Sequence, residues 1–319
     1  MDSTEILVKE IASFKEKLSI FKTLTYIEKG QIQKDNLIKK NSYYIHIYLG
    51  MLGDKEISMK EFSIMKVLNI TFDDFSKEIN RALKTDHPAL PKFYGVYFEG
   101  VHVYLIYELL VGVGLTKKSI DWTLKEKLDF LIKANKIISE LHNLNLVHKG
   151  LRTSKYLIDS SNNVHLKELG DSDYDIGSLH AKNALESDKH FCAFYPPEKM
   201  TYDDDENEDL VNSGNNEKNQ INTIETEKKF DVWSLGCIIS HVCSGVIPWS
   251  NYNREGLKSK SLKINKEVQY LIEKKEFPIP DELTKELKEI LSCCFKINPE
   301  QRCTSQELLN KLENYYNSI

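Results

Sequence analysis

The sequence predicts an α+β fold with two lobes, in which a small β-rich lobe with one helix precedes a larger α-helical lobe. Between about 31 and 110, short runs of β-branched and aromatic residues are separated by turns, which is the pattern of strands. From about 121 onward, apolar residues recur at helical spacing. The length of 319 residues is large for one hydrophobic core and suits two lobes.

Residues 4–24 are predicted to form an amphipathic helix within an N-terminal extension, 1–30. Its apolar residues recur at alternating steps of four and three, which places them on one helix face: Leu7, Ile11, Phe14, Leu18 and Phe21. Two interpretations stay open. The apolar face can dock on the protein's own domain, which we expect, or it can bind a partner or a second copy of the chain.

The β-rich lobe, 31–110, is predicted to contain two strand pairs with a helix between them. Its elements are, in order, strands 43–52 and 55–64 around a Gly-Asp turn, a helix 73–86, and strands 93–100 and 101–110 around a Glu-Gly turn.

The helical lobe, 111–319, is predicted to surround one fully buried helix. Residues 229–246 are nearly all apolar, which suits a helix that is covered on every side. Residues 202–229 are acidic, rich in asparagine and poor in aromatic residues, so we expect a mobile surface insertion there. The other helices are expected at 124–144, 263–275, 284–295 and 304–319.

Composition limits the function classes. The formal net charge of −5 argues against nucleic acid as the main partner. No apolar run reaches the length of about 18 residues that a membrane span needs, and the N-terminus lacks a secretory pattern. We therefore expect a cytoplasmic protein, with buried, reduced thiols. The six cysteines are scattered over the second half without metal-ligand spacing: Cys192, Cys237, Cys243, Cys293, Cys294 and Cys303.

The order of motifs from about 31 to 317 resembles that of a protein kinase domain, of the tyrosine-kinase-like branch. Several segments carry the resemblance. ISMKEF matches the strand of the ATP-binding lysine, FSKEI the helix of its glutamate partner, YLIYELL the strand before the hinge, VHKGLRTSKYLI the catalytic loop, VHLKELG the metal-binding motif, FYPPE the end of the activation segment, and DVWSLGCIISHVCSGVIPW and CCFKINPEQRCT the core of the lower lobe. The resemblance implies a two-lobed protein-kinase-like fold with a nucleotide pocket.

At the positions that the resemblance assigns to catalysis, this chain departs from the family pattern. The glycines of the phosphate-binding loop are replaced by Lys40, Ser42 and Ile45. Gly150 stands at the catalytic-base position, where it has no side chain to accept a proton. Lys155 stands at the position of the asparagine that holds the second metal ion, where an ammonium would repel Mg²⁺.

Two further replacements are chemically closer to the family pattern. Glu168 replaces the metal-binding aspartate, which keeps a carboxylate but adds one methylene. Arg152 replaces the auxiliary lysine of the loop and can still contact phosphate. The resemblance therefore implies ATP as a ligand of the pocket at most, with weak or absent binding of Mg²⁺.

Residues that support the fold match the family. Lys60 and Glu78 are the pair at the nucleotide pocket, and two interpretations stay open for it, a structural ion pair or a nucleotide contact. The resemblance implies a buried Glu198–Arg302 pair, an Asp231 that accepts hydrogen bonds from the catalytic-loop backbone, and His148 and Leu169 as members of a packed column.

The contrast between kept and lost residues indicates a pseudokinase that acts as a scaffold or allosteric signalling partner, with or without nucleotide sensing. Its partners would be proteins, such as an active kinase or its substrate, and no oligomeric state is predicted. The alternative is a divergent, active, ATP-dependent protein kinase, with Asp171 or Asp173 as a surrogate metal ligand. Ser172, Tyr174, Ser178 and Ser187 are candidate phosphorylation sites in the segment 171–195.

Overall fold

The computed structural model describes residues 3–40, 46–63, 72–115, 121–169, 191–199, 224–249, 272, 274 and 276–319. The chain divides into two compact units. The first comprises Met1–Gly112 and His165–His180, and the second comprises Val113–Val164 and Ala181–Ile319. Strands dominate the first unit and helices the second, so the predicted α+β class is confirmed.

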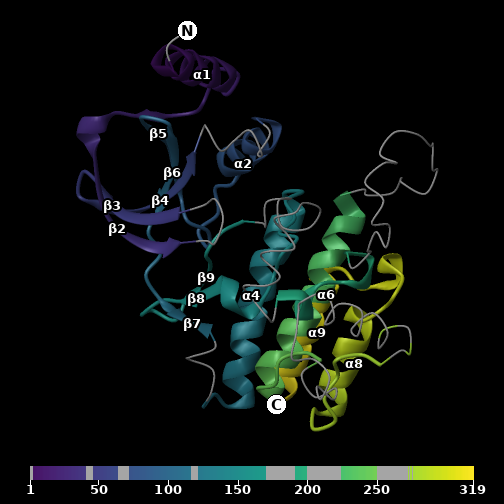
Figure 1. The fold of residues 1–319 in the computed structure, drawn as a ribbon. Helices are drawn as coiled ribbons and strands as arrows, with labels where there is room; N and C mark the ends of the chain where they lie inside the picture. Colours follow the sequence, from purple (N-terminus) through teal and green to yellow (C-terminus); the bar gives the residue numbers. More distant parts are fainter. Residues whose placement is uncertain are drawn as a thin grey trace, which may run out of the picture. The chain divides into compact units, whose positions relative to one another are not determined.

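The first unit is built on a six-stranded sheet (Figure 1). Tight turns join the antiparallel neighbours β3–β4 and β5–β6, where Gly53 and Gly100 have φ angles of 59° and 56°, a conformation that glycine adopts without strain. The sheet order is β1-β5-β6-β4-β3-β2. The strands are β1 (Tyr26–Ile27), β2 (Ile32–Lys40), β3 (His46–Leu52), β4 (Lys55–Ser63), β5 (Phe93–Glu99) and β6 (His102–Glu108), and a short 3₁₀ turn, η1 (Lys29–Gln31), precedes β2.

Two helices, α1 (Ser3–Leu18) and α2 (Phe72–Lys84), pack with this sheet into one core. Phe14 and Leu18 of α1 are buried together with Phe75 and Ile79 of α2. The predicted docking of the N-terminal apolar face on its own domain is therefore confirmed. The helix is shorter than expected, because the chain turns after Leu18.

The described helices of the second unit are α4 (Leu124–Asn143), α6 (Ile224–Ser244), α8 (Lys285–Cys294) and α9 (Ser305–Ser318). They lie side by side in Figure 1. Threonine hydroxyls cap three of them by accepting hydrogen bonds from first-turn amides, Thr123 for α4, Thr284 for α8 and Thr304 for α9. The central part of α6 is buried on all sides, as its apolar sequence predicts.

Short elements complete the second unit and the boundary region. They are strands β7 (Val113–Gly114), β8 (Tyr156–Ile158) and β9 (Val164–Leu166), and the 3₁₀ turns η3 (Thr153–Lys155), η5 (Phe191–Phe194), η6 (Pro197–Lys199) and η7 (Pro299–Gln301).

The predicted acidic insertion, 202–229, extends too far, because its last residues belong to α6. Residues 224–229 form the first turns of α6, where Glu225 and Glu227 suit the positive end of the helix dipole. Residues 202–223, most of the expected helix 263–275, Ser42, Ile45, and the segment 170–190 with Asp171, Asp173 and the candidate phosphorylation sites lie outside the described residues. Among the helices that the structure describes, none has the length and apolarity to cross a membrane.

Candidate functional site

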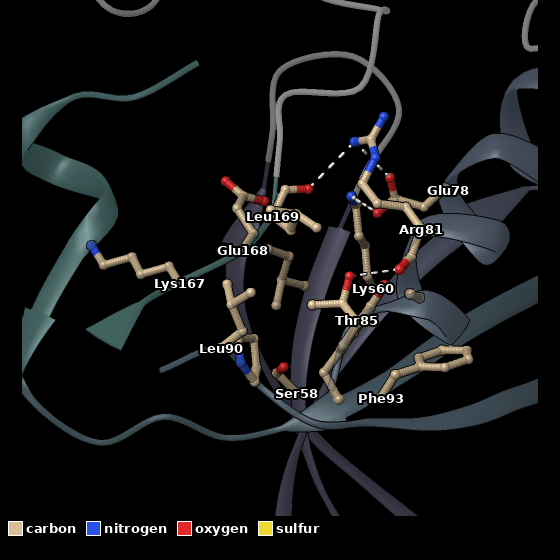
Figure 2. Close-up of a pocket in the computed structure, with 14 residues that line it drawn as sticks. Ser58, Lys60, Glu78, Arg81, Thr85, Leu90, Phe93, Lys167, Glu168 and Leu169 are labelled. Atoms are coloured by element: carbon tan, nitrogen blue, oxygen red, sulfur yellow. Dashed lines mark hydrogen bonds and ion pairs between the residues drawn. The ribbon is translucent and has the colours of Figure 1, made fainter. Parts of the chain in front are cut away.

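A pocket with an empty volume of about 660 Å³ opens in the first unit, beside β4 and α2 (Figure 2). Strands β3, β4 and β6, helix α2 and the segment after β9 contribute to its walls. The lining residues are Ile47, Ser58, Lys60, Glu78, Arg81, Ala82, Thr85, Leu90, Pro91, Phe93, Tyr107, Lys167, Glu168 and Leu169. Three residues that the sequence assigned to nucleotide binding, Lys60, Glu78 and Glu168, therefore share one pocket.

Lys60 and Glu78 form an ion pair in this pocket, with 3.0 Å between Lys60 Nζ and Glu78 Oε1. Both side chains are largely covered, at 18% and 14% exposure. A solvent-exposed ion pair stabilises a fold by less than about 1 kcal/mol. Here both side chains are mostly buried, so the surrounding residues hold them in one geometry. The pair therefore fixes how α2 sits against β4.

Arg81 adds a second cation that sequence reasoning missed. It lies one helical turn after Glu78, with 3.8 Å between Arg81 Nη1 and Glu78 Oε2. Its Nη1 also donates to the carbonyl oxygen of Leu169 at 3.3 Å, so it ties α2 to the segment that carries Glu168 (Figure 2). The i, i+3 spacing from Glu78 was the signal in the sequence.

The pKa of Tyr107 responds to the charges of both Glu78 and Glu168. Burial raises the pKa of the Tyr107 phenol well above its usual value, and the charges of Glu78 and Glu168 raise it further, while Arg81 opposes them. Two carboxylates, Glu78 and Glu168, and three basic side chains, Lys60, Arg81 and Lys167, therefore line one pocket. The carboxylates offset two of the three positive charges.

The catalytic-loop segment belongs to the second unit and is held by Asp231 of α6. Asp231 is 1% exposed and accepts hydrogen bonds from the backbone amides of His148 and Lys149, both at 2.8 Å. His142 Nε2 approaches the same carboxylate at 3.0 Å and must donate, because a carboxylate can only accept. Two bonds to one buried anion hold the loop backbone, and the third ties α4 to the same carboxylate.

The loop itself turns sharply after His148. Lys149 has a φ of 65°, which is uncommon for a residue with a side chain, and the amide of Gly150 donates to His148 Nδ1 at 3.2 Å. Lys149 Nζ lies 2.6 Å from Glu227 Oε1. Glu227 was expected in the mobile insertion, so this anchor was not predicted.

The replaced positions of the loop have well-defined environments. Gly150, to which the resemblance assigns the position of the catalytic base, is buried and has no side chain. Lys155, to which it assigns the position of a metal-binding asparagine, is 5% exposed within η3. Arg152 Nε donates to Ser154 Oγ at 3.1 Å. Lys40, the only glycine-loop position among the described residues, ends β2.

Arg302 and Glu198 meet in a two-bond ion pair. Arg302 Nη1 donates to Glu198 Oε1 at 2.5 Å, and Nη2 donates to Oε2 at 2.7 Å. The remaining guanidinium hydrogens go to the carbonyl oxygens of Lys296, Lys229 and Ile297. All five donors of a 2% exposed arginine are therefore satisfied.

Comparison with known proteins gives one family. The model of the protein kinase domain matches residues 47–312. Mitogen-activated protein kinase kinase kinase 9 of Arabidopsis thaliana is 22% identical over 285 residues, which cover 87% of this chain and 32% of that protein.

Two further relatives have similar values. Mitogen-activated protein kinase kinase kinase 1 of Arabidopsis thaliana is 22% identical, over 87% of this chain and 41% of the relative. Mitogen-activated protein kinase kinase kinase 4 of Homo sapiens is 22% identical, over 87% of this chain and 16% of the relative. The match therefore spans less than half the length of these relatives. Because the family model covers most of the sequence, the chain belongs to the protein kinase domain family, and its fold is protein-kinase-like.

Proposed function

We propose that this chain is a pseudokinase, which binds protein partners and senses nucleotide without transferring a phosphoryl group. The observation that carries the proposal is the pair of replacements in the loop held by Asp231, Gly150 and the buried Lys155. The loop keeps its scaffold and lacks the groups that phosphoryl transfer needs.

The described loop offers no carboxylate that could act as the catalytic base. The substrate hydroxyl must give up its proton to a positioned acceptor. Gly150 has no side chain, and its amide is already committed to His148 Nδ1 as a donor. Arg152 and Lys155, on the same loop, are basic residues and supply no carboxylate in its place.

The metal positions are also unfavourable. Mg²⁺ requires oxygen ligands in near-ideal octahedral geometry. Lys155 offers an ammonium in place of an amide oxygen, and the carboxylate of Glu168 is displaced by one methylene. The residues present therefore do not fit the usual two-metal arrangement.

The pocket of the first unit supports nucleotide sensing. Lys60 and Arg81 supply two cations where phosphate charge would lie, and Ile47 and Leu90 supply apolar walls. Glu78 and Glu168 offset much of that positive charge. We therefore expect weak binding of ATP that does not depend on Mg²⁺.

The alternative is a divergent, active protein kinase. The Lys60–Glu78 pair at 3.0 Å supports it, because active kinases need such a pair. The carboxylate of Glu168 supplies one metal ligand. This alternative requires a proton acceptor from outside the described loop.

The expected partners are proteins of a phosphorylation cascade, such as an active kinase or its substrate. The relatives are named as kinases that act on kinases, and a catalytically silent domain in such a setting acts by binding and by switching between arrangements. A cytoplasmic location is part of the proposal. The described cysteines Cys237, Cys243, Cys293, Cys294 and Cys303 are free thiols, which persist in a reducing compartment.

The test is a thermal-shift titration of the full chain with ATP, with and without Mg²⁺, combined with radiolabel transfer from ATP. We expect ATP at about ten times its dissociation constant to raise the melting temperature by about 3 °C, equally with and without Mg²⁺. Lys60→Ala should abolish the shift. Lys55→Ala, on the same strand but exposed and outside the pocket, should keep it.

Two results would overturn the proposal in different ways. Absence of any shift removes nucleotide sensing and leaves a pure scaffold. Transfer of radiolabel that Lys60→Ala stops and Lys55→Ala preserves removes the pseudokinase assignment and establishes the active-kinase alternative.

A further inference from the structure

Three cysteines, two of them consecutive and the third nine residues further on, come together in the second unit. Cys293 and Cys294 lie at the end of α8, and Cys303 follows η7. The three Sγ atoms lie within 4.8 Å of one another. The expectation of scattered thiols therefore does not hold for these three, because the turn at Asn298-Pro299 returns the chain to α8.

Cys293 and Cys303 are the closest of the three. Their Sγ atoms are 2.9 Å apart, and the backbone amide of Cys303 donates to the carbonyl oxygen of Cys293 at 3.1 Å. A disulfide has an S–S distance of about 2.05 Å. A small rotation of the two side chains would therefore bring these sulfur atoms to bonding distance.

A shared metal ion fits this geometry less well. Two thiolates on one tetrahedral zinc ion lie about 3.8 Å apart, given Zn–S distances of about 2.3 Å. Structural zinc sites also take four protein ligands, whereas this group has three members among the described residues. The spacing of Cys293 and Cys303 thus favours bond formation between the two sulfur atoms.

The surroundings give the two thiols different reactivity. Cys293 is partly exposed, while Cys294 and Cys303 are buried. Hydrogen bonds with the side chains of Cys294 and Cys303 lower the pKa of the Cys293 thiol, and the ammonium of Lys311 adds to the effect. The more accessible sulfur therefore loses its proton more readily, which gives the nucleophilic thiolate.

We propose that Cys293 and Cys303 are a reversible redox-modification site, which a peroxide oxidises to a disulfide. The Cys293 thiolate attacks one oxygen of hydrogen peroxide, the O–O bond breaks, and sulfenic acid and hydroxide result. The Cys303 sulfur then displaces hydroxide from the Cys293 sulfur as the S–S bond forms. In total, two thiols and one hydrogen peroxide give one disulfide and two waters, and a low-molecular-weight thiol reverses the change.

The site adjoins the anchor of the FYPPE segment. Arg302, the neighbour of Cys303, binds Glu198, and it also donates to the carbonyl oxygens of Lys296 and Ile297. Both carbonyls belong to the loop that a Cys293–Cys303 bond would close. Oxidation would therefore clamp the segment that holds Arg302 and restrict release of Glu198.

The experiment treats the full chain with a small excess of hydrogen peroxide, followed by alkylation and peptide mapping. We expect a loss of about 2 Da in intact mass, a Cys293–Cys303 cross-link, and a rise in melting temperature of about 5 °C, because the unfolded chain is constrained. Reduction with dithiothreitol should restore the starting mass and melting temperature.

Variants assign the roles. Cys303→Ser should stop at a sulfenic acid on Cys293, which dimedone traps, and Cys293→Ser should form neither product. Cys243→Ser, a partly exposed thiol on α6 remote from the cluster in sequence, should form the cross-link like the unaltered chain. Circular dichroism of each variant checks folding, and mapping of the unaltered chain does not depend on any variant.

Three outcomes would overturn the proposal. One is recovery of both thiols unmodified after peroxide treatment. Another is a cross-link that joins Cys294, or a cysteine outside the cluster, in place of this pair. The third is one zinc ion bound per purified chain that both Cys293→Ser and Cys303→Ser lose, which would make the cluster a metal site.

Discussion

At the scale of single residues, Arg302 is the most completely bonded side chain described above. Its five donors go to one carboxylate and three carbonyl oxygens, and its guanidinium stacks on Trp233 with 5.0 Å between the Arg302 Cζ atom and the ring centre. Arg302→Met keeps much of the volume but leaves these acceptors, including the Glu198 carboxylate, without their donor. We expect a loss of about 3–5 kcal/mol in the free energy of unfolding, measured by urea denaturation.

Lys296→Met is the matched control, because the Lys296 side chain is exposed and only its carbonyl oxygen contacts Arg302. The control should change stability by less than about 0.5 kcal/mol. Equal effects of the two substitutions would show that the buried pair contributes nothing specific.

Glu61 is a second buried charge, within the β-sheet of the first unit. Its carboxylate contacts His46 Nδ1 at 3.0 Å and the Tyr104 hydroxyl at 2.8 Å, and Lys34 and His102 lie at 3.7 and 3.6 Å. Burial alone would raise the pKa of Glu61. The hydrogen bonds from His46 and Tyr104 and the attraction of His102 and Lys34 outweigh it, and the net pKa is lowered.

This shift predicts an acid-sensitive first unit. A carboxyl with a lowered pKa in the folded state stabilises the fold above its unfolded pKa, near 4.5. The contribution is lost as the pH falls through the lower, folded pKa. In denaturation curves below pH 4.5, Glu61→Gln should flatten the loss of stability, whereas Glu56→Gln, exposed on the same strand, should follow the unaltered chain. Parallel pH curves for the unaltered chain and Glu61→Gln would contradict the assignment.

Contacts between residues were predictable where a motif fixes the positions. The pairs Lys60–Glu78 and Glu198–Arg302 and the acceptor Asp231 could be named from the sequence, because each lies in a recognisable segment, and the structure places them in contact with the groups expected. The Cys293–Cys303 pair could not be named, because its contact depends on the path of a turn.

At the scale of elements, α1 extends the core of the first unit. Phe14 lies 5.5 Å from Phe72 and 5.3 Å from Phe75 of α2, and 6.5 Å from Phe98 of β5, between ring centres. Phe75 belongs to the same helix as Glu78. The docked α1 therefore supports the helix that presents the pocket's glutamate.

Phe14→Ala should loosen this packing. We expect a loss of up to about 3–5 kcal/mol, limited by the free energy with which α1 docks, and faster hydrogen exchange in both α1 and α2. Val8→Ala, on the same helix but 61% exposed, should leave exchange unchanged. Faster exchange in α1 alone would mean that α2 does not depend on the docked helix.

Element boundaries were less predictable than elements. The apolar period continues through Phe21, yet α1 ends at Leu18 because the amides of Ser19 and Phe21 bond in tight turns to Glu16 and Leu18. The start of α6 was hidden by its polar sequence. Residues distant in the sequence hold its first turns, as the hydrogen bond from Lys149 to Glu227 shows. Local sequence patterns do not reveal such contacts.

At the scale of the whole molecule, the family resemblance assigns metal-binding positions to Glu168 of the first compact unit and to Lys155 of the second. Restoring both by Glu168→Asp with Lys155→Asn should therefore create Mg²⁺-dependent ATP binding. We expect Mg²⁺ to tighten binding at least about tenfold, or about 1.4 kcal/mol, in the double variant, and not in the unaltered chain. Isothermal titration calorimetry with and without Mg²⁺ measures the difference. Adding Lys60→Ala should weaken binding under both conditions. If the double variant stays insensitive to Mg²⁺, these two replacements are not what excludes the metal, and that part of the pseudokinase proposal fails.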